Sequence, residues 1–122
     1  MILADTSVWI DHLRAGDLRM QGLLNDGQII MHPMIVAELG LGSLRQRART
    51  LAELDGLLEV KAAQLSEVRR MIEARRLYGK GIGLIDAHLV ASCLITPGTL
   101  LWTRDTALKG VAKAVGIDAG LQ

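Results

Sequence analysis

Aromatic residues and cysteine are scarce in this chain of 122 residues. It has no Phe, and Trp9, Tyr78 and Trp102 are its only aromatic residues. The composition therefore predicts an aliphatic core and offers no aromatic platform on which several bases could stack. Cys93 is the only cysteine. A disulfide within the chain is excluded, which suits a protein of a reducing compartment.

Long apolar runs are missing as well. No stretch approaches the roughly 20 apolar residues that a membrane helix needs, and the N-terminus has no basic segment followed by an apolar signal core. We therefore expect a soluble, cytoplasmic protein without membrane contact. A chain of this length supports one domain with a real core but hardly two. No linker or repeat divides it, so we expect a single domain over residues 1–122.

Short apolar strands alternate with amphipathic helices along the chain. The expected strands are Met1–Ala4, Gln28–Met31 and Thr99–Thr103, with a weak candidate at Leu57–Val60. Helices are expected over residues 6–13, 17–25, 33–41, 45–56, 62–78, 86–95 and 104–115. In the helix over 62–78, Arg69 and Glu73 are spaced to pair across one turn. The alternation is typical of an α/β domain with a mainly parallel central sheet flanked by helices.

Four acidic residues share a context, because each lies in apolar sequence where a strand ends or a helix meets the sheet. They are Asp5, Glu38, Asp86 and Asp105. Ligands of open α/β sheets bind beyond the carboxyl ends of the strands, so these side chains are expected to meet there. Carboxylates that share one concavity repel each other unless a cation neutralises them. Without Cys or several His at ligand spacing, Mg²⁺ or Mn²⁺ is favoured over Zn²⁺, and such ions suit phosphodiester hydrolysis.

A structural explanation stays open for the same residues. Asp5, Asp86 and Asp105 stand where helix N-caps are expected, and Glu38 could be a solvated helix residue. A metal-free acid–base ribonuclease is a further alternative, although single histidines beside helix starts more often cap or pack. The histidines that it would use are His12, His32 and His88.

The order of these motifs resembles the VapC-type PIN-domain toxins, the nuclease half of type II toxin–antitoxin pairs. The matching segments are Asp5–His12, His32–Leu39, Gly81–Ser92 and Leu101–Asp105. The resemblance implies that Asp5, Glu38, Asp86 and Asp105 are the acidic quartet of the family, with Asp5 and Asp86 as the principal metal ligands. It places Thr103 where PIN domains often have a Ser or Thr near the metal. The last segment departs from the family form, because no Asp-Phe pair follows Asp105.

The resemblance implies a Mg²⁺-dependent endoribonuclease, with Mn²⁺ as an alternative ion, in which a metal-activated water attacks the phosphodiester and leaves a 5′-phosphate. VapC-like toxins usually form homodimers, and a small VapB-like antitoxin neutralises them by covering the acidic pocket. Trp9 could line the groove for the antitoxin or belong to the core. Two alternatives stay open: a non-catalytic RNA-binding PIN domain, and a metal-dependent DNA nuclease or phosphatase.

The distribution of charge suits a polyanionic substrate. The formal net charge is +1, and setting aside the four carboxylates leaves +5 for the remainder. Contacts between basic side chains and phosphates position a nucleic acid but carry little sequence information. The candidates for such contacts are Arg45, Arg47, Arg49, Arg69, Arg70, Arg75, Arg76, Lys80 and Arg104. Arg104, next to a proposed ligand, is the first to test, although a solvated helix face explains any one of them as well.

Overall fold

A three-stranded parallel sheet forms the centre of the computed structural model, which describes all 122 residues. The strands are β1 (Ile2–Ala4), β2 (Ile29–Ile30) and β3 (Leu100–Trp102). They lie in the order β2-β1-β3, with Ala4 opposite Trp102. The parallel sheet confirms the predicted α/β class.

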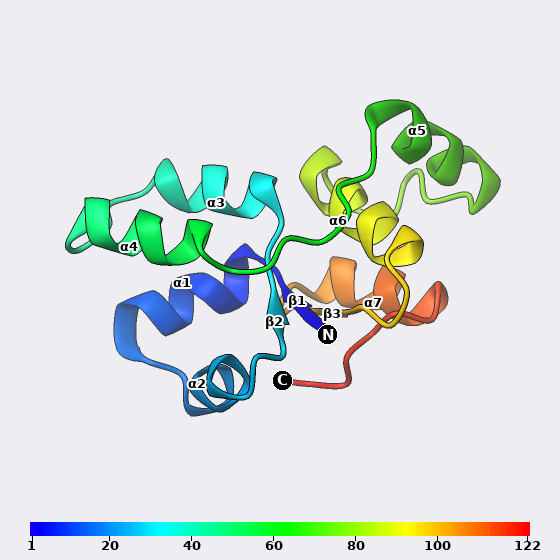
Figure 1. The fold of residues 1–122 in the computed structure, drawn as a ribbon. Coiled ribbons are helices and arrows are strands. Elements are labelled where there is room, and N and C mark those ends of the chain that lie inside the picture. The colour runs from blue at the N-terminus through cyan, green and yellow to red at the C-terminus, as the bar shows by residue number, and fades with distance from the viewer.

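Seven helices surround this sheet (Figure 1). They are α1 (Thr6–Ala15), α2 (Leu18–Asn25), α3 (Pro33–Gly40), α4 (Arg47–Asp55), α5 (Leu65–Ala74), α6 (Leu84–Ile95) and α7 (Thr106–Ala114). None of them combines the length and the apolarity that crossing a membrane takes. Four of them begin at a capping side chain: Asp5, Asp17, His32 and Asp105 each accept a hydrogen bond from a backbone amide of the helix that follows, and Asp5 and Asp105 are caps that the sequence predicts.

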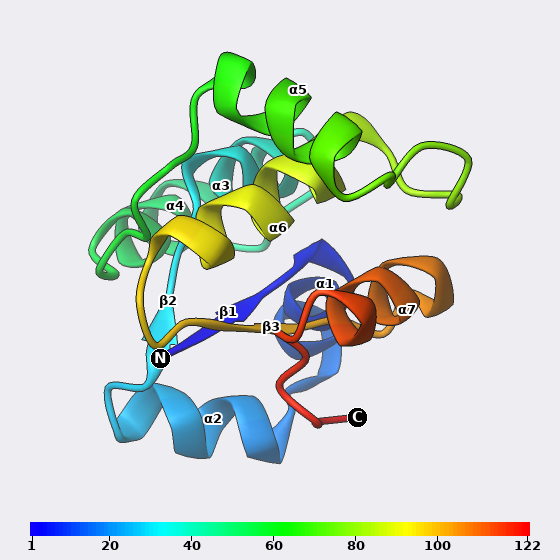
Figure 2. The same ribbon diagram turned by 90° about the vertical axis from the view of Figure 1, so that its right-hand side faces the viewer.

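The two crossover connections leave β1 and β2 in opposite directions. Helices α1 and α2 connect β1 to β2, whereas α3 to α6 connect β2 to β3 on the other side of β1. Right-handed crossovers therefore place the two groups of helices on opposite faces of the sheet, and Figure 2 shows α5 and α6 over one face and α2 across the other. The carboxyl ends of β1 and β3 meet at the point where the direction of connection changes, which is the usual ligand-binding edge of such a sheet.

The core is mainly aliphatic but contains both tryptophans. Trp9 and Trp102 are the largest fully buried side chains, so the prediction of an aliphatic core holds for the rest of the core but not for these two residues. Trp9 faces the core, where it is 2% exposed, and not a docking groove. Cys93 is a buried free thiol on α6. Burial raises the pKa of this thiol to about 12, because a buried thiolate is poorly solvated.

Three local predictions need correction. The helix predicted over 62–78 is shorter: Gln64 is the N-cap of α5, and the helix ends at Ala74, with Arg75 as its C-cap. The weak strand candidate at 57–60 forms one bridge, between Met31 and Glu59, and no strand. Arg69 and Glu73 do not pair: the ion pair on a helix face at this spacing is that of Arg49 with Glu53 on α4. Ion pairs between exposed side chains contribute little free energy, so favourable spacing alone does not predict that a pair forms.

Candidate active site

Asp5 is the most constrained of the four predicted acids. Its backbone amide donates to the carbonyl of Trp102 at 2.9 Å, which continues the pairing of β1 with β3 by one residue. Its side chain is 5% exposed and caps α1. Oδ1 accepts from the amide and the hydroxyl of Ser7, and Oδ2 accepts from the hydroxyl of Thr103. Asp5 is therefore the cap that the sequence allowed, and its carboxylate is held in one orientation by Ser7 of α1 and by Thr103, which directly follows β3.

Asp105 is joined to Asp5 through Thr103. The Thr103 hydroxyl, which donates to Asp5, accepts from the backbone amide of Asp105 at 3.0 Å. Oδ2 of Asp105 in turn accepts from the amide of Leu108 at 2.9 Å and so caps α7. The other oxygen of this carboxylate accepts no hydrogen bond from the protein. Adjacent strands in register therefore place a buried hydroxyl between the two acids.

Glu38 reaches the same neighbourhood from α3. Its Oε1 accepts from the hydroxyl of Thr6, the first residue of α1, at 2.6 Å. Thr6 directly follows Asp5, so Glu38 lies one residue away from the cap of α1. The sequence alone did not single out Thr6. No local pattern could have indicated this contact, because 32 positions separate the two partners.

The fourth acid, Asp86, lies close enough to the other three for their charges to affect its pKa. It is the third residue of α6, three positions after the N-cap Gly83, and its Oδ2 accepts from the amide of Gly83 at 3.3 Å. Burial raises the pKa of Asp86, and the charges of Asp5, Asp105 and Glu38 raise it further. The structure thus brings all four predicted residues into one acidic cluster. We use this name below for Asp5, Glu38, Asp86 and Asp105.

The donor chemistry of the acidic cluster suits a hard divalent cation. Its side chains offer only carboxylate oxygens, the donors that Mg²⁺ and Mn²⁺ prefer. Asp86, Asp105 and Glu38 each retain one oxygen that accepts no hydrogen bond from the protein. No three His, Cys, Asp or Glu side chains stand close enough to form a ready ligand group. The four carboxylates therefore lie near one another, but their oxygens are not arranged around one metal position.

The histidines have structural roles. Nδ1 of His12 accepts from the backbone amide of Asp17 at 3.1 Å. His32 caps α3 through its Nδ1 and lies 3.1 Å from the Ser92 hydroxyl through its Nε2. His88 is buried on α6, with no hydrogen bond to its Nδ1. These contacts agree with the expectation that single histidines beside helix starts cap or pack.

Comparison with known protein families matches residues 2–114 to the PIN domain. The chain belongs to the PIN-domain family. It is also 44% identical over 117 residues to a protein named Ribonuclease VapC32, which is found in two strains of Mycobacterium tuberculosis. The alignment covers 96% of this chain and 94% of that relative. The resemblance to VapC-type PIN domains is therefore confirmed along almost the whole chain.

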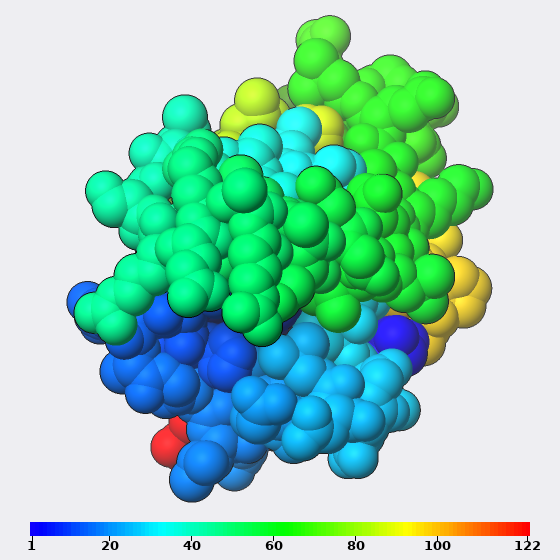
Figure 3. Space-filling model, turned by 60° about the vertical axis from the view of Figure 1, so that its left-hand side comes forward, coloured from blue at the N-terminus to red at the C-terminus, as the bar shows by residue number.

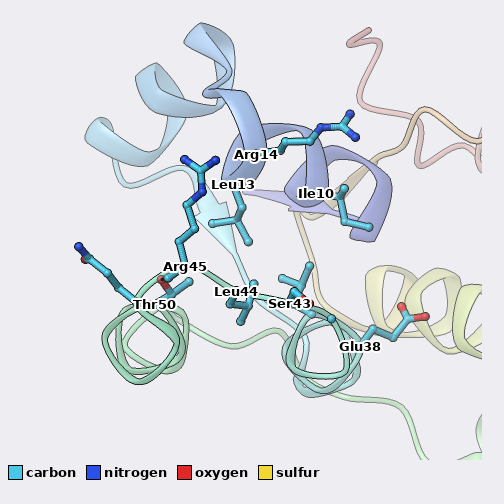
Figure 4. A pocket seen from close by; sticks show the side chains of 11 residues that line it. Ile10, Leu13, Arg14, Glu38, Ser43, Leu44, Arg45 and Thr50 are labelled. Carbon is cyan, nitrogen blue, oxygen red and sulfur yellow. The ribbon is translucent and has the colours of Figure 1, made fainter.

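One end of a large groove in this PIN domain lies beside the acidic cluster. The groove has a volume of about 590 Å³ and runs between α1 on one side and α3 and the start of α4 on the other. Figure 3 views the molecule from the side on which α3 and α4 lie over α1 and α2. In Figure 4, Glu38 lies at one end of this groove, and Arg45 lies at the other. Ile10, Leu13 and Leu44 give it an apolar lining, and Arg14 and Arg45 add positive charge. Glu38 is the only member of the acidic cluster that lines it.

Arg104 does not behave as a free phosphate ligand in this PIN domain. Its guanidinium donates to Asp11 at 2.7 Å and to Asp17 at 2.6 Å, and it lies 5.4 Å from the centre of the Trp102 ring. These two ion pairs raise the pKa of Arg104. The amide of Met20 and the guanidinium of Arg104 lower the pKa of Asp17. In this conformation the guanidinium is thus committed to two carboxylates, and the phosphate contact expected of Arg104 stays a prediction.

Replacing Arg104 by Gln is expected to lower the free energy of unfolding by about 2 kcal/mol, because hydrogen bonds to charged groups contribute more than neutral ones. The substitution leaves Asp17, which is 19% exposed, without its cation. Arg14→Gln is the matched control, since Arg14 is 74% exposed and meets only Asp11, at 3.3 Å. It should cost less than about 0.5 kcal/mol. Urea unfolding measures both, and equal losses would refute the stabilising role.

Proposed function

We propose that this PIN domain is an endoribonuclease and the toxin of a type II toxin–antitoxin pair. We further propose that its activity depends on a divalent cation, Mg²⁺ or Mn²⁺, held by Asp5, Glu38, Asp86 and Asp105. The observation that carries the proposal is the meeting of the four carboxylates beyond the carboxyl ends of β1 and β3, where the hydroxyls of Thr6 and Thr103 hold Glu38 and Asp5 and the charges of the other three acids act on Asp86. Carboxylates that repel one another gain from a neighbouring cation. The relative named Ribonuclease VapC32 supports RNA as the substrate.

The residues of the acidic cluster would divide the work according to their surroundings. Asp5 is held by Ser7 and Thr103 and would present its carboxylate in a fixed direction. Asp86 is half-buried and would be the acid most dependent on the cation for its charge. Asp105 and Glu38 would orient the attacking water through their free oxygens. A bound divalent cation would activate water and stabilise negative charge on the phosphoryl oxygens.

The partner in this proposal is a VapB-like antitoxin. The groove between α1 and α3 ends at Glu38, so a segment bound in it would lie against the acidic cluster. Its apolar lining suits the apolar side of a peptide, and Arg14 and Arg45 suit acidic side chains at its edge. Homodimer formation and a cytoplasmic location belong to the proposal through the family resemblance alone.

The test is cleavage of a mixed-sequence RNA and of single-stranded DNA of the same sequence by the purified protein. We expect RNA cleavage with Mg²⁺ or Mn²⁺, none with EDTA, and new 5′-phosphate ends that can be ligated and sequenced. Cleavage of RNA in EDTA would instead support a histidine acid–base mechanism. Preferential cleavage of DNA, or binding of RNA without cleavage under any condition, would support one of the two alternatives and refute the proposed activity.

A further inference from the structure

A second groove of this PIN domain lies between α7 and the loop that joins α5 to α6. In Figure 2 this loop projects on the same side of the molecule as α7. The groove has a volume of about 560 Å³, which falls in the range of ligand-binding clefts. Leu77 and Val111, both buried, contribute to its floor. Arg75, Arg76 and Lys80 line it from the loop. We call it the α7 groove.

The α7 groove adjoins the acidic cluster through both of its walls. On one wall, Thr106 directly follows Asp105 and lines the groove. On the other wall, the loop ends at Gly83, whose amide donates to Asp86. The two walls lie against each other where Gly81 faces Ala107: a Cβ atom at position 81 would be in van der Waals contact with Cβ of Ala107, at 3.5 Å. A polymer bound at the acidic cluster and extending to this side would therefore enter the α7 groove within a few of its units.

The charge of the α7 groove is of one sign. Arg75, Arg76 and Lys80 are exposed and form no ion pair, and no acidic residue lines the groove. Arg76 has a φ of 54°, a left-handed conformation that is uncommon for a residue other than glycine. The groove beside Glu38 differs, because its lining includes that carboxylate together with Arg14 and Arg45. The two grooves that flank the acidic cluster thus suit different partners.

An exposed aromatic residue adds a second feature of a nucleic-acid surface. Tyr78 is 59% exposed, whereas both tryptophans are buried. It lies between Leu77 and Lys80, which both line the α7 groove. Single-stranded nucleic acids bind where basic side chains follow the backbone and an aromatic ring stacks on a base. A cationic groove that adjoins a single exposed aromatic ring fits one unpaired strand better than it fits an isolated phosphate ion.

We propose that the α7 groove holds the phosphate backbone of a single-stranded RNA on one side of the acidic cluster. The proposal deepens the proposed function and rests on it. Arg75, Arg76 and Lys80 contact the phosphates that flank the bond to be cut, and Tyr78 stacks on a neighbouring base. Of the nine basic residues that the sequence offered as phosphate contacts, the structure selects these three through their place beside the acidic cluster.

The test measures RNA binding by the double variant Arg76→Gln/Lys80→Gln, which keeps long polar side chains but removes two charges. The matched control is Arg69→Gln/Arg70→Gln, which removes the same charge from a part of α5 that does not line the α7 groove. The probe is a fluorescein-labelled 12-nucleotide RNA of mixed sequence. Both variants and the parent protein carry Asp5→Asn, and anisotropy is followed between 50 and 300 mM salt, so that cleavage does not interfere.

We expect the groove variant to bind this RNA roughly tenfold more weakly at low salt, and the slope of log Kd against log salt to fall by about 1.4, since each phosphate contact of a single strand contributes about 0.7. The control should keep the parental slope to within about 0.3. Equal losses in both variants would mean that the effect is general surface charge and would overturn the proposal. Selective loss of binding to a labelled oligoglutamate, with RNA binding kept, would overturn it in favour of an acidic protein partner.

Cleavage by the protein with Asp5 intact separates this proposal from the proposed function. If that protein cuts RNA and the groove variant binds RNA as the control does, the groove assignment is wrong and the nuclease stands. If the protein with Asp5 intact binds RNA through the α7 groove but does not cut it, the proposed nuclease activity is wrong and the RNA-binding role of the groove is supported. If it neither binds nor cuts RNA, both proposals fail.

Discussion

Asp5→Asn is expected to reduce metal-dependent RNA cleavage at least about a hundredfold while shifting the Tm by no more than about 2 °C. Asn retains a side-chain oxygen for the amides of Ser7 and Val8, and Asn and Asp are equally good N-caps. Its NH₂ group would take the place of Oδ2, and the Thr103 hydroxyl, which now donates to Oδ2, can accept from that group instead. The substitution also removes one of four mutually repelling charges. The fold is therefore spared, whereas a cation loses a carboxylate ligand. Initial cleavage rates in Mg²⁺ and thermal unfolding, measured on the same preparation, check both expectations.

The pKa of Asp86 provides a readout of Asp5→Asn that does not depend on activity. Because the charge of Asp5 contributes to the raised pKa of Asp86, that pKa should fall in the variant. It should stay above its usual range, because burial is the larger cause. An NMR titration of the Asp86 side chain in metal-free buffer measures the change.

The matched control is Asp26→Asn, an exposed acid at the end of α2 that lies outside the acidic cluster. This variant should keep the parental cleavage rate and the parental pKa of Asp86. An Asp5→Asn protein that retains cleavage would remove Asp5 from the site. An unchanged pKa of Asp86 would show that the two carboxylates do not interact.

The strands and most helices of this protein could be predicted because local patterns dictate them. The run Met1–Ala4 is continuously apolar, as a buried parallel strand requires, and Asp5 and Asp105 cap helices in the way that Asp commonly does. Boundaries were less predictable. Asp86 stood where the sequence predicts the N-cap of its helix, but Gly83 caps α6. A glycine cap has no side-chain donor or acceptor and therefore leaves no polar signal in the sequence.

The membership of the acidic cluster could be predicted, but its supporting contacts could not. The four acids stand out because each interrupts apolar sequence. Of the hydroxyls that hold them, the family resemblance pointed to Thr103, whereas Thr6 is not distinctive in the sequence, because it meets Glu38 only through the fold. The ion pair of Arg104 could not be predicted for the same reason: its partner Asp17 is 87 positions away. Contacts between distant segments depend on strand register, which no local motif encodes.

His32 gives this PIN domain a stability that depends on pH. Its Nδ1 accepts from the amide of Met34, so this nitrogen carries no proton, and Nε2–H donates to the Ser92 hydroxyl. The same hydroxyl accepts from the amide of Ala63. If Nδ1 were protonated, its N–H would face the N–H of Met34, and the hydrogen bond at the start of α3 would be lost. Burial, together with the positive charge that neighbouring His88 can carry, lowers the pKa of His32 from 6.5 to about 4.

The free energy of unfolding should therefore fall by about 2 kcal/mol between pH 7 and pH 5 through His32 alone. Below pH 6.5 the unfolded chain binds a proton at this residue, whereas the folded chain binds it only near pH 4, so the stability present at neutral pH is lost as the pH falls. Asn at position 32 can still cap α3 but does not titrate, so urea unfolding of His32→Asn should show a dependence on pH that is smaller by this amount. Parallel curves for His32→Asn and the parent protein would show that His32 is not the source.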